Sequence, residues 1–520
     1  MPKVAKGKRK RAYRPRTRSG CITCKIRRVK CDETHPECLR CTSTRRICDG
    51  YSQVPLLRLS SSVGVPATVM TGPFNACARS RRSFAFFTQR TCPQLAGFFG
   101  SDFWERLVLQ SAHHESAIRH AIVAIGALHE HQAMRAGASG TFALEQYNLA
   151  IRSLLVPLSQ NRQQAVDVCL ISCLLFTCFE NMQGRHAVAG SHIQSGSKLL
   201  RETVYDGRSG VLQHQVLGSD SRANSYVSLD VLATILAGLN TEVAMMMRDY
   251  KYKTYENYFS GVMESDTIFS FSSIREAKSV FEHGRYLPVF TSSHPTELSC
   301  NAVAASDTIQ GHIAYCTTLM SKFSHALQAF VKTRGSSLTP KEDIAVAVLQ
   351  LHVLDTQVSF HLEHLPLAYQ PHSSQLLPQM KEIVTLGEKI ISFISPHDDS
   401  RCQAISFCLD MGFIIPLYTV ASQCQEPSTR RRAIALLRST SRQEGLWNSL
   451  LIAQAAERIM EIEEIEGMQL RPSGDAASSS TSPGVSTVLQ LDSRGGRLQY
   501  VRQCQEVDTY ISVTEEVFNW

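Results

Sequence analysis

The sequence predicts a large all-α domain preceded by a small cysteine-rich module, with a short β-hairpin near the C-terminus. Three observations predict this fold class. Apolar residues recur at three- and four-residue spacing over most of residues 91–470. Six cysteines are concentrated within residues 21–48. Two short apolar runs flank a glycine-containing turn at residues 492–496, which is typical of a hairpin.

The helical periodicity is clearest in two segments early in the large domain. One face combines Ile118, Ala121, Ile122, Ile125 and Leu128, and another combines Leu144, Tyr147, Ile151, Leu154 and Leu155. Proline and glycine separate most of the further helices that we expect. These helices cover residues 166–184, 186–201, 226–262, 303–333, 375–396, 402–422, 430–439 and 446–464.

Composition divides the chain into five parts. Residues 1–20 contain nine Lys/Arg and no acid, which predicts a disordered basic tail. Residues 21–50 form the cysteine module. Residues 51–90 are rich in Pro, Gly and Ser without acids, as expected for a linker. The helical domain at 91–470 is followed by a Ser-rich segment and the hairpin within 471–520.

The C-terminal hairpin is expected to pair Val488–Leu491 with Arg497–Val501. The last 16 residues contain four acids and no Lys or Arg. This acidic end is either an activation segment or a strand or helix that closes onto the body, and we favour the second interpretation.

Charge is distributed unevenly along the chain. The net charge is +8, but residues 1–90 carry 21 basic and four acidic residues, whereas residues 91–520 carry 33 basic and 42 acidic residues. The basic end predicts contact with a polyanion such as nucleic acid. We find neither a signal peptide nor a bilayer-spanning apolar segment, so we expect an intracellular protein without a membrane partner.

The six cysteines have the spacing of a metal site. Four thiolates complete one tetrahedral zinc ion, so six must hold something else. Two zinc ions have eight ligand positions, and six thiolates fill them if two thiolates bridge both ions. No histidine or water is then needed, which indicates a structural site. His35 within the array is therefore not expected to be a ligand. The proposed ligands are Cys21, Cys24, Cys31, Cys38, Cys41 and Cys48.

So short a module cannot fold by burying apolar surface alone, and we expect metal binding to supply its folding free energy. Six thiolates and two zinc ions together carry a charge of −2. Nearby cations offset this charge and keep the thiols deprotonated. They are Lys25, Arg27, Arg28, Lys30, Arg40, Arg45 and Arg46.

The stretch Ser19–Asp32 resembles the fungal binuclear zinc cluster transcription factors. The cysteine spacing, the basic residues between the second and third cysteines, and Pro36 two residues before the fourth all match that pattern. The resemblance implies bridging by Cys21 and Cys38. It further implies that Cys24 and Cys31 complete one zinc ion and that Cys41 and Cys48 complete the other.

The resemblance also implies a DNA interface. A short helix after the second cysteine would enter the major groove over a CGG-type triplet, with Arg27 and Arg28 at the base-reading positions. Arginine can bond guanine O6 and N7 together. Relatives commonly carry lysine in place of Arg28, which leaves the triplet less defined. The expected phosphate contacts are Lys25, Lys30, Arg45 and Arg46, together with Arg14, Arg16 and Arg18 of the tail.

Residues Lys8, Arg9, Lys10 and Arg11 form a dense basic tract in the tail. They predict a nuclear import signal, and the alternative is that they only add affinity for DNA. The linker lacks heptads, because prolines and glycines interrupt it, so a dimer through a linker coiled coil is not supported. The helical body could still form a homodimer.

Looser motifs within residues 90–465 resemble the fungal-specific regulatory domain that often follows such clusters. They include Phe103-Trp104 and Arg442–Trp447. The resemblance implies an all-helical module that controls activity, with the transcription machinery or a small-molecule effector as partner. Regulators of this kind often govern secondary-metabolite clusters or nutrient pathways.

Other reactive side chains have simpler interpretations. Cys169, Cys173 and Cys178 lie on one apolar segment without neighbouring cations, so we expect core packing and not a redox sensor. The histidines of the first helices have no i, i+4 pair and are interpreted as polar helix faces, not as metal ligands. They are His113, His114, His120, His129 and His131.

No catalytic motif is found, so we do not expect an enzyme. We expect a nuclear, sequence-specific regulator of RNA polymerase II genes in a fungus. The rival is a binding or scaffold protein whose cluster mediates protein contacts, or a repressor that acts by sequestering partners. Residues 1–30 favour DNA, since a protein-contact module would not need so many cations.

Overall fold

The computed structural model divides the chain into two compact units, Met1–Pro73 and Phe74–Trp520. In the first unit it describes residues 23–24, 27, 29, 31–32, 34, 38–44 and 48. In the second unit it describes residues 77–134, 140–159, 165–206, 211–214, 217–221, 225–246, 269–291, 302–364, 375–394, 406–469, 485–492, 495–503 and 510–519.

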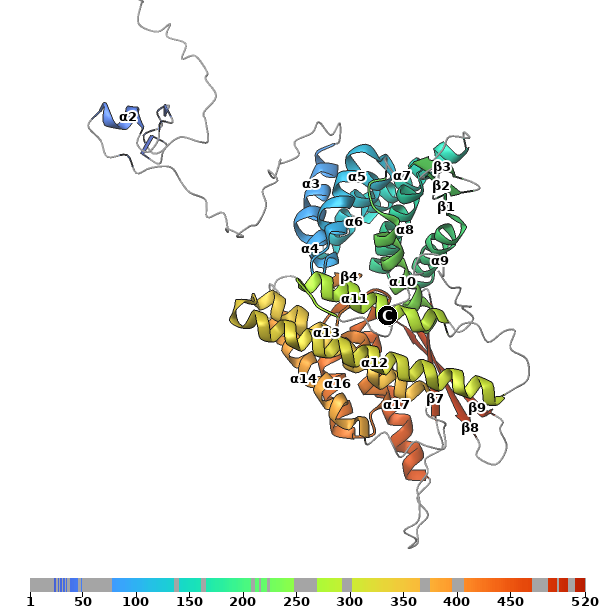
Figure 1. Ribbon diagram of the computed structural model, residues 1–520. Coiled ribbons are helices and arrows are strands. Elements are labelled where there is room, and N and C mark those ends of the chain that lie inside the picture. The colour runs from blue at the N-terminus through green and yellow to red at the C-terminus, as the bar shows by residue number, and fades with distance from the viewer. Residues whose placement is uncertain are drawn as a thin grey trace, which may run out of the picture. The chain divides into compact units, whose positions relative to one another are not determined.

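The second unit is mostly helical, as the apolar periodicity predicts (Figure 1). Its first half contains α3 (Ala78–Phe86), η1 (Phe87–Thr91), α4 (Cys92–Leu95), η2 (Phe103–Leu107), α5 (Val108–His114), α6 (Ser116–Met134), α7 (Gly140–Ser159), α8 (Val166–Met182), α9 (His186–Glu202) and α10 (Leu229–Met246). Its second half contains α11 (Ile274–Thr291), α12 (Ala302–Arg334), η4 (Gly335–Ser337), α13 (Pro340–His364), α14 (Leu377–Ile394), α15 (Ile414–Gln423), α16 (Pro427–Arg438) and α17 (Ser449–Gln469).

Helix α8 is the central element of the first half. Nearly all of its residues are buried, because α6, α9 and α10 pack around it. Its apolar residues are not confined to one face, as is typical of a fully enclosed helix. Phe179 stacks on Tyr147 of α7 with ring centroids 4.1 Å apart. This packing explains why the segment can be so apolar. No helix in the described ranges meets the length and hydropathy that a membrane span requires.

The helical body begins earlier than residue 91. Helix α3 and η1 occupy the end of the expected linker and pack against α6. Phe87 is fully buried, and Arg82 forms an ion pair with Glu130 at 2.6 Å. Gly126 permits this contact, since a Cβ there would lie 2.1 Å from the Ser83 carbonyl oxygen. Basic residues on the exposed side of α3 obscure its apolar face in the sequence.

Three small sheets accompany the helices. Strands β1 (Val204–Asp206), β2 (Val211–His214) and β3 (Gly218–Ser221) are antiparallel. Strand β4 (Ser406–Cys408) runs parallel to β5 (Arg442–Glu444), which pairs antiparallel with β6 (Trp447–Asn448). The third sheet contains β7 (Val485–Asp492), β8 (Gly495–Gln503) and β9 (Tyr510–Asn519), all antiparallel.

The expected C-terminal hairpin is confirmed. Strands β7 and β8 pair in the register Val488 with Gln499, and Asp492 with Gly495. The acidic end forms strand β9, which pairs with β8 along its length. The acidic end is therefore a strand, as the second of the two interpretations has it.

Three expected helices differ from the structure. The helix expected over 446–464 begins only at Ser449, because Trp447–Asn448 pair with β5 as strand β6. The helix expected over 402–422 begins only at Ile414, because residues 406–408 pair with β5 as a strand. The helix expected over 226–262 begins at Leu229 and extends to Met246, and residues 247–262 lie outside the described part. Helices α11 and α13 were not predicted from the sequence.

Candidate zinc centre and DNA interface

The five described cysteines of the array are buried together. Their exposed fractions do not exceed 9%, and the apolar side chain packed beside them is that of Val29, which is itself only partly buried. A core made almost entirely of sulfur cannot hold a fold by the hydrophobic effect. The described residues of this unit are therefore consistent with a segment whose folding depends on bound metal.

The sulfur positions fit zinc. The Cys38 Sγ lies 3.7 Å from the Cys24 Sγ, and the Cys41 Sγ lies 3.8 Å from the same atom. A tetrahedral zinc ion with Zn–S bonds of about 2.3 Å separates its sulfurs by about 3.8 Å. The Cys24–Cys38 distance is that of two ligands of one ion, which agrees with the partition implied by the family resemblance. The Cys24–Cys41 distance is equally short, although that partition assigns these two cysteines to different ions, with Cys38 between them. In that arrangement Cys38 is the described thiolate that serves both ions.

Asp32 organises the backbone around Cys38. Its carboxylate accepts the backbone N–H groups of Leu39 and Arg40, each at 2.9 Å, and the Thr34 hydroxyl at 2.6 Å. The Thr34 hydrogen bond, with the two backbone donors, lowers the pKa of Asp32 to about 2. Asp32 lies close to the sulfurs of Cys31 and Cys38, but its oxygens are occupied by these donors. It therefore caps the first turn of α2 (Leu39–Thr42) through the N–H groups of Leu39 and Arg40.

Cys38 is held by backbone donors as well. The Cys41 N–H donates to its Sγ at 3.3 Å, and its own N–H donates to the Cys48 Sγ at 3.5 Å. N–H donors stabilise thiolates and orient them toward a metal. The second half of the array, from Cys38 to Cys48, is thus connected through the backbone of Cys38.

Arg27 is the one base-reading candidate within the described residues. Its Nη1 donates to the Thr44 hydroxyl at 3.4 Å, and its backbone N–H donates to the Thr23 carbonyl. Thr44 in turn donates to the carbonyls of Arg40 and Cys41. The Arg27 guanidinium is therefore oriented from the second half of the array. Asp32, Thr34 and Thr44 had no role in the sequence analysis, although a carboxylate shortly before a short helix is a capping signal.

The other expected site residues lie outside the described part of the chain. This applies to the ligand Cys21 and to the base-reading candidate Arg28. It also applies to the phosphate contacts Lys25, Lys30, Arg45, Arg46, Arg14, Arg16 and Arg18, and to the import tract Lys8, Arg9, Lys10 and Arg11.

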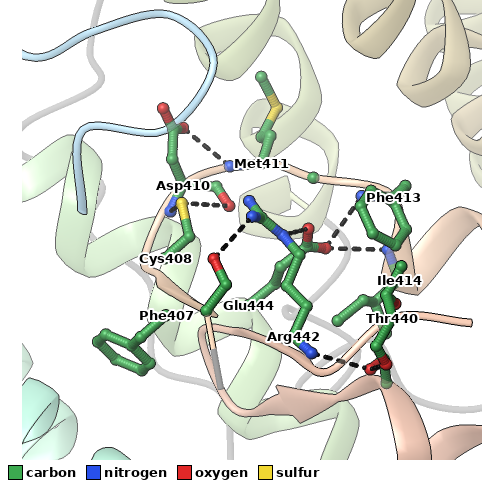
Figure 2. Close-up of polar contacts among 12 residues, drawn as sticks. Phe407, Cys408, Asp410, Met411, Phe413, Ile414, Thr440, Arg442 and Glu444 are labelled. Atoms are coloured by element: carbon green, nitrogen blue, oxygen red, sulfur yellow. Dashed lines mark hydrogen bonds and ion pairs between the residues drawn. The ribbon is translucent and has the colours of Figure 1, made fainter. Parts of the chain in front are cut away.

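The helical unit contains a buried polar cluster at the Arg442–Trp447 motif. Figure 2 shows Arg442 beside Glu444, whose carboxylate points to the backbone of Phe413 and Ile414. Arg442 Nε lies 2.6 Å from one Glu444 oxygen, and the two backbone N–H groups donate to the other at 2.9 Å. Glu444 therefore caps helix α15 from a neighbouring strand. A Cβ at Gly412 would lie 1.8 Å from this carboxylate, so only glycine fits there.

The same motif connects distant helices. Asn181 of α8 donates to the Gly445 carbonyl at 3.2 Å, and Glu242 of α10 accepts the Leu446 N–H at 2.9 Å. Gly445 has a φ of 54°, which disfavours any residue with a Cβ. The motif thus ties the first half of the helical unit to the second.

The expected packing of the α8 cysteines is confirmed. Cys169 and Cys178 are buried, Cys173 is partly buried, and burial raises the pKa of Cys169 and Cys173 to about 12. Such thiols are protonated and inert near neutral pH.

The interpretation of the histidines as polar faces is wrong for His129. Its ring is 3% exposed, bonds the Thr91 hydroxyl at 2.9 Å and packs edge-on against Phe86. Helix α3 and η1 cover it, and these elements were missed in the sequence.

Comparison with known families decides the identity of both units. The fungal Zn(2)-Cys(6) binuclear cluster domain matches residues 19–56, and the fungal specific transcription factor domain matches residues 82–461. The chain belongs to the fungal Zn(2)-Cys(6) transcription factor family. Its binuclear cluster domain holds two zinc ions. The family comprises transcription regulators, which are not enzymes.

Relatives include one regulator that matches along almost the whole chain and two that match over a part of it. The Aspercryptin biosynthesis cluster-specific transcription regulator atnN of Emericella nidulans is 24% identical over 97% of this chain and 96% of its own length. Transcription regulator lscL of Purpureocillium lilacinum is 26% identical over 35% of this chain and 48% of its own length. Transcriptional regulatory protein moc3 of Schizosaccharomyces pombe is 64% identical over 7% of each chain. No solved structure matches this zinc cluster regulator.

Proposed function

We propose that this zinc cluster protein binds double-stranded DNA sequence-specifically in the nucleus and regulates RNA polymerase II genes of a fungus. The observation that carries the proposal is the buried group of thiols, in which Cys24 and Cys38 have the spacing of two ligands of one zinc ion, within a segment whose basic residues far exceed its acids. A structural metal fixes the backbone, and a fixed backbone can present side chains to the grooves of DNA.

Within this proposal the roles are divided among the residues. Cys21 and Cys38 bridge the two ions, Cys24 and Cys31 complete one ion, and Cys41 and Cys48 complete the other. Arg27 and Arg28 read guanines of a CGG-type triplet. The hydrogen bond from Arg27 to Thr44 supports a fixed orientation for that guanidinium. The phosphate contacts are Lys25, Lys30, Arg45, Arg46, Arg14, Arg16 and Arg18.

The test is a binding measurement on the zinc-loaded full-length protein. Fluorescence anisotropy would compare a CGG-containing duplex with a scrambled duplex of equal length over a range of salt concentrations. We expect binding at least about 10³-fold tighter to the CGG duplex at physiological salt. Removal of zinc by a chelator should abolish the preference, because the cluster unfolds. Equal affinity for both duplexes would instead favour the scaffold interpretation.

We further propose that the targets form a biosynthetic gene cluster. The support is the relative atnN, whose name describes a cluster-specific regulator and which matches along almost the whole chain. Mapping of occupied genomic sites, combined with transcript changes on deletion, tests this. Occupied promoters scattered among unrelated genes would contradict it.

Partners of the helical unit are a separate part of the proposal. A homodimer through the helical body would let two clusters engage paired triplets, and sedimentation equilibrium of the full-length protein without DNA tests it. A sedimenting mass equal to the monomer mass of 57.8 kDa at micromolar concentration would exclude the dimer.

A further inference from the structure

Helix α7 has a buried face and an exposed face. Tyr147 and Ala150 lie on the buried face, which packs against α6 and α8. Leu144, Leu149 and Leu155 lie on the exposed face, with exposed fractions of 37%, 38% and 53%. Among the described residues, four of the eight exposed large hydrophobic side chains belong to this one helix. Such a concentration of apolar side chains with polar neighbours is typical of a protein–protein contact site.

The exposed residues of α7 form one continuous stripe. They recur at intervals of three and four residues, which keeps them on one side of an α-helix. The stripe is about 23 Å long, so a second helix can lie along it. Its members are Thr141, Leu144, Glu145, Asn148, Leu149, Arg152, Leu155 and Val156. The apolar face of this helix is therefore wider than the core of the helical unit covers.

The stripe contains one acidic and one basic residue, Glu145 and Arg152. Seven residues separate them, which corresponds to about 10.5 Å along the helix axis. Ion pairs within a helix join residues three or four apart, so these two side chains cannot pair with each other. In the described part of the chain, neither side chain forms an ion pair with another residue. Both charges are therefore available to a molecule that lies along the stripe.

A second copy of α7 in the antiparallel direction provides a partner for both charges. A two-fold axis beside Leu149 places Glu145 of each copy opposite Arg152 of the other copy. A parallel copy would instead place like charges opposite each other, which is unfavourable. In the antiparallel arrangement, Leu144 lies within about 3 Å, measured along the helix axis, of the partner's Leu155. The stripe is thus complementary to itself in both charge and apolar surface.

We propose that the exposed stripe of α7 is a homodimer interface, formed by antiparallel pairing of α7 with the same helix of a second copy. This inference deepens the homodimer part of the proposed function and rests on it. A different protein would not require Glu145 and Arg152 to be placed symmetrically about Leu149. A single helix pair buries less surface than an obligate dimer does, so we expect reversible association at micromolar concentration. Simultaneous binding of both clusters to one DNA molecule would strengthen the association.

The test is sedimentation equilibrium of the full-length, zinc-loaded protein without DNA at micromolar concentration. The unmodified protein should form a reversible dimer. Glu145→Arg and Arg152→Glu each replace two attractive pairs in the dimer by two repulsive pairs. Each variant should therefore weaken dimerisation at least about tenfold. The double variant restores opposite charges and should dimerise as the unmodified protein does.

A mixture of the two single variants separates a lost interface from a lost fold. One variant carries two basic residues on the stripe and the other carries two acidic residues, so an equimolar mixture should form heterodimers. Leu149→Asp places two acids beside the two-fold axis and should abolish the dimer. Glu382→Arg, which reverses an exposed acid on α14, is the matched control and should leave dimerisation unchanged.

The proposal is overturned if the unmodified protein is monomeric, or if the two single variants dimerise as the unmodified protein does. It is also overturned if neither the double variant nor the mixture recovers dimerisation. A dimer that is insensitive to every α7 variant would refute this interface and leave the homodimer itself intact. Affinity for a duplex with one CGG triplet should be equal in all variants, so a failure of the proposed DNA binding is detected separately.

Discussion

At the scale of single residues, the zinc unit depends on a few atoms with more than one partner. Cys38 contacts Cys24 through sulfur, Cys41 through an N–H donor and Cys48 through its own N–H. Asp32 fixes the first turn of α2 in the same way. A thiolate that serves two ions should therefore be more sensitive to substitution than a terminal one.

We predict that Cys38→Ser lowers the zinc content from two ions per chain and unfolds the cluster, because both ions lose a ligand. Atomic emission on the purified protein measures this. Cys77→Ser, which changes an exposed cysteine outside the array, is the control and should retain two ions. Retention of two ions and an intact cluster in Cys38→Ser would refute the bridging role.

We predict that substitution of Arg28 reduces the specificity of DNA binding, whereas substitution of the tail arginines reduces its overall affinity. Arg28→Ala should cost about 1–3 kcal/mol on a CGG duplex and much less on a scrambled one. Alanine at Arg14, Arg16 and Arg18 should weaken binding to both duplexes by the same factor. It should also flatten the slope of log affinity against log salt by about 0.9 for each phosphate that is no longer neutralised. Salt titrations measure both effects, and equal losses for Arg28→Ala would leave Arg27 as the next candidate.

Burial of His129 predicts a dependence of stability on pH. Desolvation lowers the pKa of its imidazole to about 4, from 6.5 in the unfolded chain. Between these values the unfolded state binds more protons, so the free energy of unfolding falls as pH decreases. From pH 7 to pH 5 the loss from this residue is about 2 kcal/mol.

Urea unfolding of the protein and of His129→Gln at pH 7 and pH 5 measures this contribution. The variant should lose less stability on acidification than the unmodified protein does. His361→Gln, which changes an exposed histidine, should behave as the unmodified protein. An identical loss in all three proteins would show that His129 does not titrate in this range.

At the scale of secondary structure elements, side chains from outside a helix decide where several helices begin. Helix α13 begins after Thr339, whose hydroxyl and N–H bond Glu342 at 2.8 Å in a capping box. Helix α15 is capped by Glu444, which lies on a strand 30 residues away in sequence. The first signal is local and could have been found in the sequence, whereas the second could not.

We predict that Glu444→Gln lowers the free energy of unfolding by about 3 kcal/mol, because it leaves Arg442 as a buried charge without its partner and weakens the α15 cap. Urea unfolding followed by circular dichroism measures this. Glu388→Gln breaks an exposed pair with Arg432 and should cost less than about 1 kcal/mol. Similar losses in the free energy of unfolding for both variants would show that the buried pair contributes no more to stability than the exposed pair.

At the scale of the whole molecule, the chain combines two units with opposite charge balance. The basic residues are concentrated toward the N-terminus, and the helical unit carries the acidic excess. The basic residues that attract a polyanion thus belong to a different part of the sequence from the module that we expect to regulate activity. Localisation signals in the basic tail should act independently of the helical fold.

We predict that alanine at Lys8, Arg9, Lys10 and Arg11 together leaves a fluorescently tagged full-length protein largely cytoplasmic, since a dense basic tract is what import receptors bind. Microscopy of living cells measures this. Alanine at Arg14, Arg16 and Arg18 is the matched control and should leave the protein nuclear. Unchanged nuclear accumulation of the first variant would assign the tract to DNA affinity alone.

The zinc chemistry and the helical class follow from the amino-acid sequence without the structure. Cysteine spacing counts ligands directly, and a period of 3.6 residues identifies an amphipathic helix without knowledge of its neighbours. The hairpin followed from its turn and alternation, and the packing of the α8 cysteines followed from their apolar surroundings. These features are local, so the sequence carries them completely.

Features that depend on partners distant in the sequence are visible only in the folded structure. Strand β4 was expected as helix, since its pairing with β5 joins segments about 35 residues apart. Helix α3 packs on α6 because Gly126 leaves room for its backbone, which no pattern within residues 78–86 reveals. A cavity beside Asp410 is lined by residues of α4, η2, α10, α11, α13 and β5, which are far apart in the sequence. Hydrogen bonds and buried charges between such segments depend on three-dimensional distance, and local periodicity contains no information about it.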